Sequence, residues 1–355
     1  MKQQRTPGRL GKLGLAGLAA VLGAAPTPAS TSAQSVAELQ TGVSLCAPTF
    51  QNRLTSFKAS LLYLNDPKER CWVWDDVAPG FTVWLSRSGL APAPQQVIVV
   101  SAKGKPDFAA HSRIFLRIIG GPGASIGPDQ SDGHVLDLIR PGDVLVTPAY
   151  EGTVHGTFYP NENFTASTTR IAAWLRELRR RNPQSEVVLI GESLGGPLAL
   201  EANRLAGAGG ADRIVLLAPL AFTPDAADRN FTAQRGERYR NDRQKTMRIM
   251  PTAPNGTAGY RKVYSTDLFT SFFPAEQRSK DLGERLKKAG NVPILLVYGS
   301  ADNVVGTGVI EALPPAANVR VVRIADMPHK LNAEFGRKVT AAVIDYLDGP
   351  GHNRP

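Results

Sequence analysis

The chain has 355 residues, of which 42% are hydrophobic and 20% are charged, and its formal net charge is +10. These proportions are ordinary for a soluble globular protein that can bury a large core. The excess of positive charge can attract acidic surfaces, but no nucleic-acid-binding motif accompanies it. We therefore expect no nucleic-acid partner.

The first 33 residues differ from the rest of the chain. They carry four cations and no acid, and their apolar run at residues 13–25 is too short to span a bilayer. Small residues at 31–33 suit a cleavage site, so the sequence predicts a secretory signal peptide at residues 1–33. Loss of the four cations leaves a net charge of +6. We expect an exported protein, periplasmic or secreted, with no integral membrane segment after cleavage.

The chain holds two cysteines, Cys46 and Cys71. An exported protein meets an oxidising compartment, where two thiols are more often paired than free. We therefore expect a structural disulfide between them. Closing that loop stabilises the fold by about 3.5 kcal/mol in the chain-entropy model.

Residues 34–90 are expected to form an N-terminal extension that packs on the main body. Apolar residues recur at helical spacing within residues 50–64, and Trp72, Trp74 and Trp84 lie in strand-like runs. Clustered tryptophans can stack on a sugar, but packing is the commoner reason for them. We expect these three to pack.

After this extension, apolar runs typical of buried strands alternate with helical ones. Strands are predicted at residues 97–100, 114–119, 144–146, 187–191, 214–218, 294–298 and 319–324, and helices at residues 132–139, 165–181, after residue 195 and at 333–347. Repeated strand-helix units indicate a mostly parallel central sheet flanked by helices. The rhythm breaks at residues 220–290, which separates two parts of the core, 91–219 and 291–349, while 350–355 form a tail.

The helix predicted at residues 165–181 has polar residues at both ends. Thr165 or Ser167 is the expected N-cap, and Asn182 followed by Pro183 is a typical stop. The residues between them include an apolar set at helical spacing, so we expect this helix to cover one face of the sheet.

One strand-to-helix connection reads Gly191-Glu-Ser193-Leu-Gly195, a G-x-S-x-G sequence. Between a buried strand and a helix, this pattern predicts a nucleophile elbow, a sharp turn that lifts the serine hydroxyl clear of the sheet. Gly191 and Gly195 lack the Cβ atoms that would collide across such a turn. Ser193 is therefore the candidate nucleophile. A glycine-rich connection with an incidental serine remains the simpler alternative.

A serine nucleophile needs a base within hydrogen-bond reach and an acid that orients the base. Asp302 and His329 lie in the loops that follow the last two predicted strands. Parallel-sheet enzymes gather their sites at the carboxyl ends of strands, where these side chains and Ser193 would all project. We expect Asp302 to orient His329 and His329 to act as the base.

These assignments have competitors. Asp302 could instead form an Asx turn, and His329 could be a surface loop residue. Asp326 is a weaker candidate for the acid, because it shares a loop with His329. The other candidates for the base are His111, His134 and His155.

The sequence Gly120-Gly-Pro-Gly123 follows a predicted strand and precedes a helix, which is where one oxyanion donor is expected. The backbone N–H groups of Gly121 and of Leu194, just after the nucleophile, are the two candidate donors of the oxyanion hole. A glycine turn without a ligand is the alternative. A phosphate loop is poorly supported, because no Gly-Lys-[Ser/Thr] follows.

The candidate residues follow one another along the chain as Ser193, Asp302 and His329, which is the order found in α/β-hydrolases. Over roughly residues 97–347 the chain resembles the α/β-hydrolase-fold serine hydrolases. Within that superfamily, the loop at residues 120–123 is similar to the His-Gly-Gly-Pro-Gly loop of proline iminopeptidase relatives, with Ile119 where that loop carries His. The resemblance implies an α/β-hydrolase fold in which residues 220–290 form a cap insertion.

The sequence thus predicts an exported serine hydrolase that cleaves a carboxylic ester through an acyl-enzyme, acting on a small-molecule ester or a short peptide. The alternatives are a proline iminopeptidase-like aminopeptidase and a non-catalytic binding protein on the same fold. No cofactor is expected, and the five histidines are scattered without ligand spacing, so no metal is expected. The basic run in the cap is expected to be a solvated helix face.

Overall fold

The structure is a computed structural model, which describes residues 71–74, 81–88, 95–102, 113–120, 133–148, 163–227, 229–230 and 272–349. For the first three of these segments it describes the backbone alone. All of these residues belong to one compact unit, residues 34–355. The predicted signal peptide, the cysteine pair, the packing of the tryptophans and the tail lie outside the described residues or side chains, so they stay predictions.

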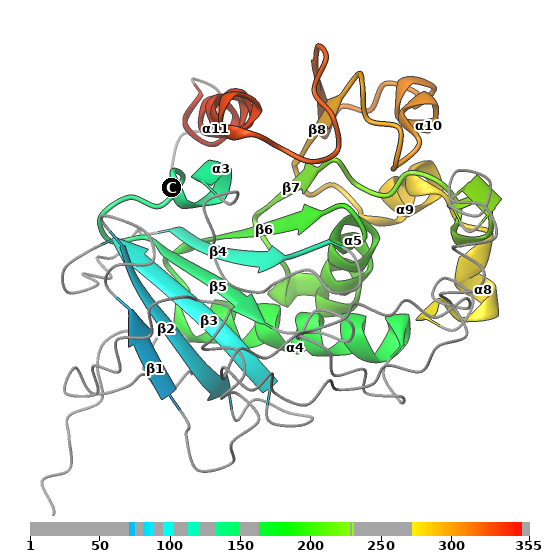
Figure 1. Ribbon diagram of the computed structural model, residues 1–355. Coiled ribbons are helices and arrows are strands. Elements are labelled where there is room, and N and C mark those ends of the chain that lie inside the picture. Colours follow the sequence, from blue (N-terminus) through cyan, green and yellow to red (C-terminus); the bar gives the residue numbers. More distant parts are fainter. Residues whose placement is uncertain are drawn as a thin grey trace, which may run out of the picture. The chain divides into compact units, whose positions relative to one another are not determined.

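The described strands form one sheet of nine (Figure 1). In chain order they are β1 (Cys71–Trp74), β2 (Phe81–Ser88), β3 (Gln95–Ala102), β4 (Arg113–Ile118), β5 (Val144–Pro148), β6 (Glu186–Glu192), β7 (Arg213–Leu217), β8 (Ile294–Gly299) and β9 (Val319–Ile324). Across the sheet they run β1-β2-β3-β5-β4-β6-β7-β8-β9. From β5 to β9 every neighbouring pair is parallel, which confirms the prediction of a mostly parallel sheet.

The described part of the N-terminal extension joins this sheet edge to edge. Strand β2 pairs antiparallel with β1 on one side and with β3 on the other, with Phe81 opposite Ala102. Strand β3 then pairs antiparallel with β5, with Val97 opposite Pro148. Residues 71–74 and 81–88 therefore contribute backbone hydrogen bonds to the sheet as strands.

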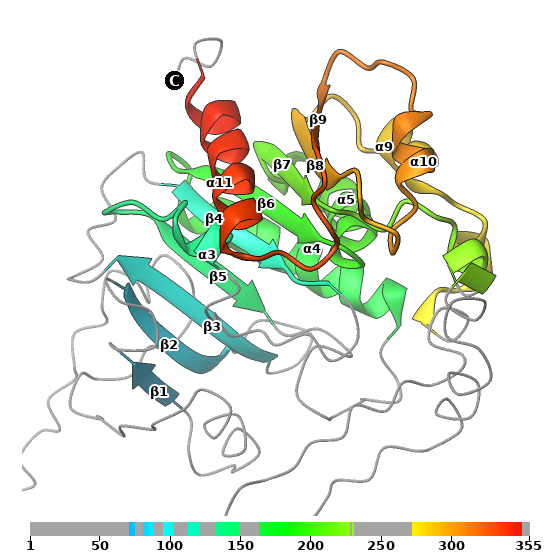
Figure 2. The same ribbon diagram turned by 45° about the horizontal axis from the view of Figure 1, so that its top comes forward.

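Helices cover both faces of the sheet (Figures 1 and 2). They are α3 (Gly133–Leu136), α4 (Phe164–Arg181), α5 (Gly195–Ala206), α8 (Ala275–Arg278), α9 (Leu282–Lys288), α10 (Thr307–Glu311) and α11 (Ala333–Asp348), with a 3-10 turn at Gly207–Gly209. Helices α4 and α5 pack together on one face, and α3 and α11 pack together on the other. The helix expected at residues 132–139 is shorter than predicted, because the chain leaves α3 in a turn after Leu136.

The N-cap predicted for α4 is wrong. Asn163 caps this helix, since its side-chain Oδ1 accepts a 3.0 Å hydrogen bond from the N–H of Ala166. Thr165 and Ser167 lie inside the helix. Asparagine is as good a cap as serine or threonine, so the sequence pattern does not show which of these residues caps the helix. The predicted stop is confirmed, with Asn182 as the C-cap.

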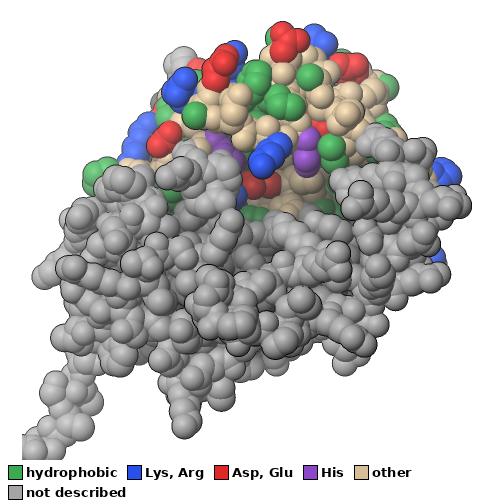
Figure 3. All heavy atoms as spheres, in the orientation of Figure 1, with side chains coloured by type: hydrophobic (Ala, Val, Ile, Leu, Met, Phe, Trp, Pro, Cys, Tyr) green, Lys and Arg blue, Asp and Glu red, His purple; other side chains and the backbone are tan. Residues whose placement is uncertain are grey.

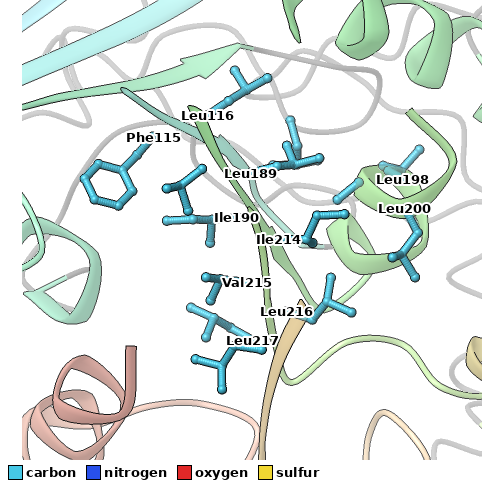
Figure 4. Close-up of a cluster of buried hydrophobic side chains, with 14 of the residues drawn as sticks. Phe115, Leu116, Leu189, Ile190, Leu198, Leu200, Ile214, Val215, Leu216 and Leu217 are labelled. Carbon is cyan, nitrogen blue, oxygen red and sulfur yellow. The ribbon is translucent and has the colours of Figure 1, made fainter. Parts of the chain in front are cut away.

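The core lies between the sheet and its helices. Strands β4, β7 and β8 are buried along their whole length, and Figure 4 shows side chains of β4 and β7 gathered with those of β6 and α5 into one apolar cluster. Helix α4 adds Trp174 and Leu175, each at most 1% exposed. In the part of the face that Figure 3 describes, acidic and basic side chains are interspersed on the outside.

The carboxyl end of α11 is fixed by two buried arginines at the amino ends of strands. Arg113, the first residue of β4, donates a 2.9 Å hydrogen bond to the carbonyl of Leu347, and Arg213 of β7 donates one of 2.9 Å to the carbonyl of Tyr346. Glu186, which begins β6, forms 2.7 Å ion pairs with both arginines. Cations at a helix carboxyl end are favourable for the helix dipole. This network anchors α11 to the sheet.

Both ends of the predicted cap are described, and the rest lies outside the described residues. At the second end, Phe272 and Phe273 pack on Phe164 at the start of α4, with ring centroids 6.2 and 4.8 Å away. The guanidinium of Arg285 lies 5.2 Å from the centroid of the Phe164 ring. Burial lowers the pKa of Arg285 to about 10. Helix α9, which carries Arg285, rests on α5. Among the described residues no helix combines the length and the apolar character that a membrane span requires.

The burial of α4 leads to a stability prediction. Leu175→Ala should lower the free energy of unfolding by about 2–5 kcal/mol, because Leu175 is fully buried and its loss leaves a cavity. The matched control is Leu205→Ala on α5, where the same truncation removes a side chain that is 39% exposed and should cost within about 0.5 kcal/mol. Urea unfolding measures both. Equal losses would contradict the packing described for α4.

Candidate active site

Ser193 lies where β6 turns into α5. Its φ of 50° is in the left-handed region, which a residue with a Cβ rarely adopts and which costs on the order of 1 kcal/mol. The backbone holds it there, since its N–H donates to the carbonyl of Leu217 at 2.9 Å and its carbonyl accepts from the N–H of Leu220 at 2.9 Å. The strained turn expected of a nucleophile elbow is therefore present in the structure.

Two glycines allow this turn to lie against the end of β4. A Cβ on Gly195 would be 2.1 Å from the carbonyl oxygen of Ile118, and one on Gly120 would be 2.4 Å from the Cβ of Ser193. Real Cβ atoms do not approach so closely, so only glycine fits at either position without movement of the backbone. The first turn of α5 and the chain that leaves β4 are thus in direct contact at the elbow.

Asp302 and His329 come from two loops that are tied to each other. The N–H of Ala301 donates to the carbonyl of Met327 at 3.2 Å, and a Cβ on Gly299 would be 1.9 Å from that same carbonyl oxygen. The loops after β8 and β9 therefore touch through their backbones. This contact sets the distance between the two side chains.

The structure brings Ser193, His329 and Asp302 together in one chain of hydrogen bonds. The hydroxyl oxygen of Ser193 lies 3.1 Å from Nε2 of His329, and Nδ1 of His329 lies 2.8 Å from Oδ2 of Asp302. The other carboxylate oxygen, Oδ1, accepts a 2.8 Å hydrogen bond from the N–H of Val304. The side chain of Asp302 is fully buried, whereas that of His329 is 26% exposed. The histidine can therefore reach both the serine and a bound molecule.

The competing residues do not share this arrangement. Asp326 is exposed, has a φ of 58°, and uses its N–H to donate to the hydroxyl of Ser300. Its loop position alone suggested it as the acid, but Asp302 is the carboxylate that contacts His329. His134 lies on α3 beside the same site, and His111 and His155 lie outside the described residues.

Of the two candidate oxyanion donors, the structure describes one. Leu194 is the N-cap residue of α5, a helix of 12 residues whose amino end is next to the serine. The N–H groups and the dipole at a helix amino end favour negative charge. Gly121 lies outside the described residues, although its neighbour Gly120 borders the site. The role of Gly121 therefore stays a prediction.

A cavity of about 190 Å³ opens beside Ser193 and His329. Its remaining walls come from the ends of β4, β6, β7 and β8, from α3, from the loop after β9, and from α11 with the segment that leads into it. These residues are Ile119, Gly120, His134, Glu192, Leu217, Ala218, Val297, Met327, Leu331 and Val339. Most of them are apolar, so the cavity suits a small, mainly apolar group. Among the described residues, no group of His, Cys, Asp and Glu could hold a metal ion.

An ion pair at the elbow was not predicted from the sequence. Glu192, the residue before the serine, receives hydrogen bonds of 2.7 and 2.9 Å from the guanidinium of Arg117 on β4. Burial alone would raise the pKa of Glu192, but the charge of Arg117 and the nearby His134 hold that pKa below its ordinary value. The only signal in the sequence is the unusual presence of charged residues in two otherwise apolar strands.

Comparison with known proteins identifies the family. The model of the alpha/beta hydrolase family matches residues 122–353, so the chain belongs to the alpha/beta hydrolase family. No curated protein sequence matches the chain.

Solved structures share the fold at low sequence identity. Est1E from Butyrivibrio proteoclasticus, bound to ferulic acid, is 14% identical with a TM-score of 0.53, over 75% of this chain and 99% of that one. A highly thermostable carboxyl esterase from Bacillus coagulans is 16% identical with a TM-score of 0.52, over 77% and 99%. A proline iminopeptidase from Mycobacterium smegmatis is 14% identical with a TM-score of 0.47, over 74% and 97%. The predicted α/β-hydrolase fold is confirmed.

The two aspartates of the site can be told apart by substitution. Asp302→Asn should slow the reaction of Ser193 with a fluorophosphonate probe by roughly a thousandfold or more, because His329 loses the group that fixes its tautomer. Asp326→Asn, in the neighbouring loop, should change the labelling rate by less than about twofold, as expected for an exposed residue away from the hydrogen-bonded chain. Labelling is followed by intact mass. The reverse pattern would assign the acid to Asp326.

Proposed function

We propose that the protein is an exported serine hydrolase that cleaves a carboxylic ester through an acyl-enzyme. The observation that carries the proposal is the hydrogen-bonded chain from Ser193 through His329 to Asp302, beside a cavity that Ser193 and His329 both line. Membership of the alpha/beta hydrolase family supports a hydrolytic reaction, and the likeness of fold to a carboxyl esterase is consistent with it.

In the first half of the reaction, Ser193 becomes acylated. Its Oγ attacks the ester carbonyl carbon while Nε2 of His329 takes the hydroxyl proton. Asp302 accepts the hydrogen bond from Nδ1–H, which leaves Nε2 able to act as the base and stabilises the imidazolium. The N–H groups of Leu194 and Gly121 stabilise the oxyanion. When the tetrahedral intermediate collapses, the bond to the alcohol oxygen breaks and His329 returns the proton to the departing alcohol.

In the second half, water releases the acyl group. His329 takes a proton from the water as its oxygen attacks the acyl carbon, and the same two N–H groups stabilise the second oxyanion. The bond between that carbon and Oγ of Ser193 then breaks, and Oγ recovers its proton from His329. The products are the alcohol and the carboxylic acid, and the serine is regenerated.

The surroundings of Ser193 favour an ester over an aminoacyl substrate. An aminopeptidase must hold a cationic amino group next to the bond that it cleaves, and an unpaired carboxylate would serve that purpose. Among the described residues that line the cavity, the carboxylate is Glu192, and both of its oxygens already accept hydrogen bonds from Arg117. A cavity of about 190 Å³ with mainly apolar walls better suits a short acyl chain.

A panel of substrates tests this proposal. The protein should hydrolyse p-nitrophenyl acetate and butyrate, and kcat/KM for aminoacyl-p-nitroanilides should be lower by about 100-fold or more, because the carboxylate among the described cavity residues is already engaged and cannot hold an amino group. Ser193→Ala is the control and should abolish turnover. Faster cleavage of the anilides would favour the aminopeptidase. An unreactive Ser193 toward both substrates and a fluorophosphonate would favour a binding protein.

Export and the cysteine pair form a second part of the proposal. The basic and then apolar start of the chain supports cleavage near residue 33, and an oxidising compartment would pair Cys46 with Cys71. Protein purified from the exported fraction should begin near Gln34, and thiol titration after denaturation without reductant should find no free thiol. Intact mass gives the start of the chain. A retained residue 1 with two titratable thiols would contradict both expectations.

A further inference from the structure

We propose that Glu192 is a positioning residue, which acts through Arg117 to hold the nucleophile elbow against the chain that leaves β4. The inference rests on the proposed function in one respect, namely that Ser193 is the nucleophile. It adds an element outside the three hydrogen-bonded residues of the site. Glu192 and Arg117 would set where Ser193 stands relative to the oxyanion donors.

The ion pair has a defined geometry. Arg117 donates from Nε to Oε1 of Glu192 at 2.7 Å and from Nη2 to Oε2 at 2.9 Å. Two parallel hydrogen bonds between a guanidinium and a carboxylate fix the direction of both groups, which a single contact does not. The Arg117 side chain is 3% exposed and that of Glu192 is 16% exposed, so little water competes for these bonds.

The position of this pair in the sheet gives it a mechanical role. Pairing between β4 and β6 runs from Arg113 opposite Glu186 to Ile118 opposite Gly191. Ser193 and the chain that begins at Gly120 lie just beyond that last pair. Backbone pairing of these two strands therefore ends before the site, and the side chains of Arg117 and Glu192 continue the connection between them.

Steric contact alone does not keep the two segments together. A Cβ on Gly120 would be 2.7 Å from the carbonyl oxygen of Glu192 and 2.4 Å from the Cβ of Ser193, so the chain at Gly120 already touches the elbow. Contact prevents a closer approach but does not oppose separation. The ion pair opposes separation, because moving the elbow away from β4 would pull two buried, opposite charges apart. Together they hold the spacing from both directions.

The charge of Glu192 makes a direct contact with substrate a poorer explanation. Although burial would raise its pKa, Arg117 and His134 keep that pKa below the ordinary value, so the carboxylate is ionised at neutral pH and cannot donate a proton. Both oxygens accept hydrogen bonds from Arg117, and Nε2 of His134 also lies near Oε1, at 3.6 Å. Glu192 is thus committed to its neighbours on β4 and α3.

The same two strands supply a matched control. At their amino ends, Glu186 of β6 pairs with Arg113 of β4 at 2.7 Å, with side chains 19% and 4% exposed. This pair resembles Glu192 with Arg117 in charge and burial, although Glu186 divides its two oxygens between Arg113 and Arg213, each at 2.7 Å. It lies at the opposite end of the strands from Ser193, so it shares the structural role but not the proposed positioning role.

The experiment compares Glu192→Gln with Glu186→Gln. For each we measure kcat and KM on p-nitrophenyl butyrate, the rate of fluorophosphonate labelling, and the urea midpoint. Glu192→Gln should lower kcat and the labelling rate by about 10- to 100-fold with KM within about twofold, since small displacements of a reacting group cost this much. Glu186→Gln should lower the urea midpoint and leave kcat of the folded protein within about twofold.

Arg117→Lys gives a second test if Glu192→Gln does not fold. It keeps the charge but loses the two parallel bonds, so kcat and labelling should again fall by about tenfold at similar KM. Equal kinetic effects of the Glu192 and Glu186 variants, or full activity of the Arg117→Lys variant, would overturn the proposal. A rise in KM with unchanged kcat would overturn it too, and would make Glu192 a substrate contact instead. Failure of the wild type to be labelled would overturn the proposed function as well, which separates the two outcomes.

Discussion

The site depends on places where two backbones touch with no side chain between them. Gly195 brings the start of α5 against the carbonyl of Ile118, and Gly299 brings the loop after β8 against the carbonyl of Met327. A Cβ would lie 2.1 and 1.9 Å from those oxygens. Because a close-packed interior does not relax freely around such contacts, the loops that carry Ser193, Asp302 and His329 have fixed positions. Their side-chain hydrogen bonds are made on that framework.

Parallel strand order turns these local contacts into one site. Strands β4, β6, β7, β8 and β9 all end at the same edge, so loops more than a hundred residues apart in sequence meet there. From β4 the chain continues to β5 on one side of the sheet, and from β6 it continues to β7 on the other side. The strand order therefore switches between the neighbours β4 and β6, which is where open α/β sheets leave a crevice. Ser193 follows one of the two strands that border this crevice, and Gly120 follows the other.

Much of this could be predicted from the sequence, because the signals are local. Four apolar residues before a G-x-S-x-G turn identify the strand and the elbow at Ser193, and Asp302 and His329 lie in the loops after the predicted strands at residues 294–298 and 319–324. The choice of Asp302 over Asp326 was harder, since both are loop aspartates near the same histidine. It is decided by the backbone contact between two loops, which no sequence pattern reports.

The rest could not be predicted, because it depends on pairing between distant residues. Arg117 and Glu192 are 75 residues apart, and each appears in the sequence as an isolated charge within a strand. Whether such a charge is exposed or buried with a partner depends on which strands become neighbours. The prediction of where α4 starts failed for a different reason, since asparagine, serine and threonine are all good caps and Asn163, Thr165 and Ser167 lie within five residues.

The anchoring of α11 has a consequence for how the protein is made. His329 and the cavity residue Val339 belong to the part of the chain that the ribosome synthesises after every described strand of the sheet. A growing chain that extends just past Asp302 already contains Ser193 and the proposed acid, but it lacks His329, the proposed base, and Val339 of the cavity wall. A serine without its base is a weak nucleophile. In the proposed mechanism the site is therefore complete only once α11 has been synthesised, and the carboxyl end of that helix then meets the arginines at the start of β4 and β7.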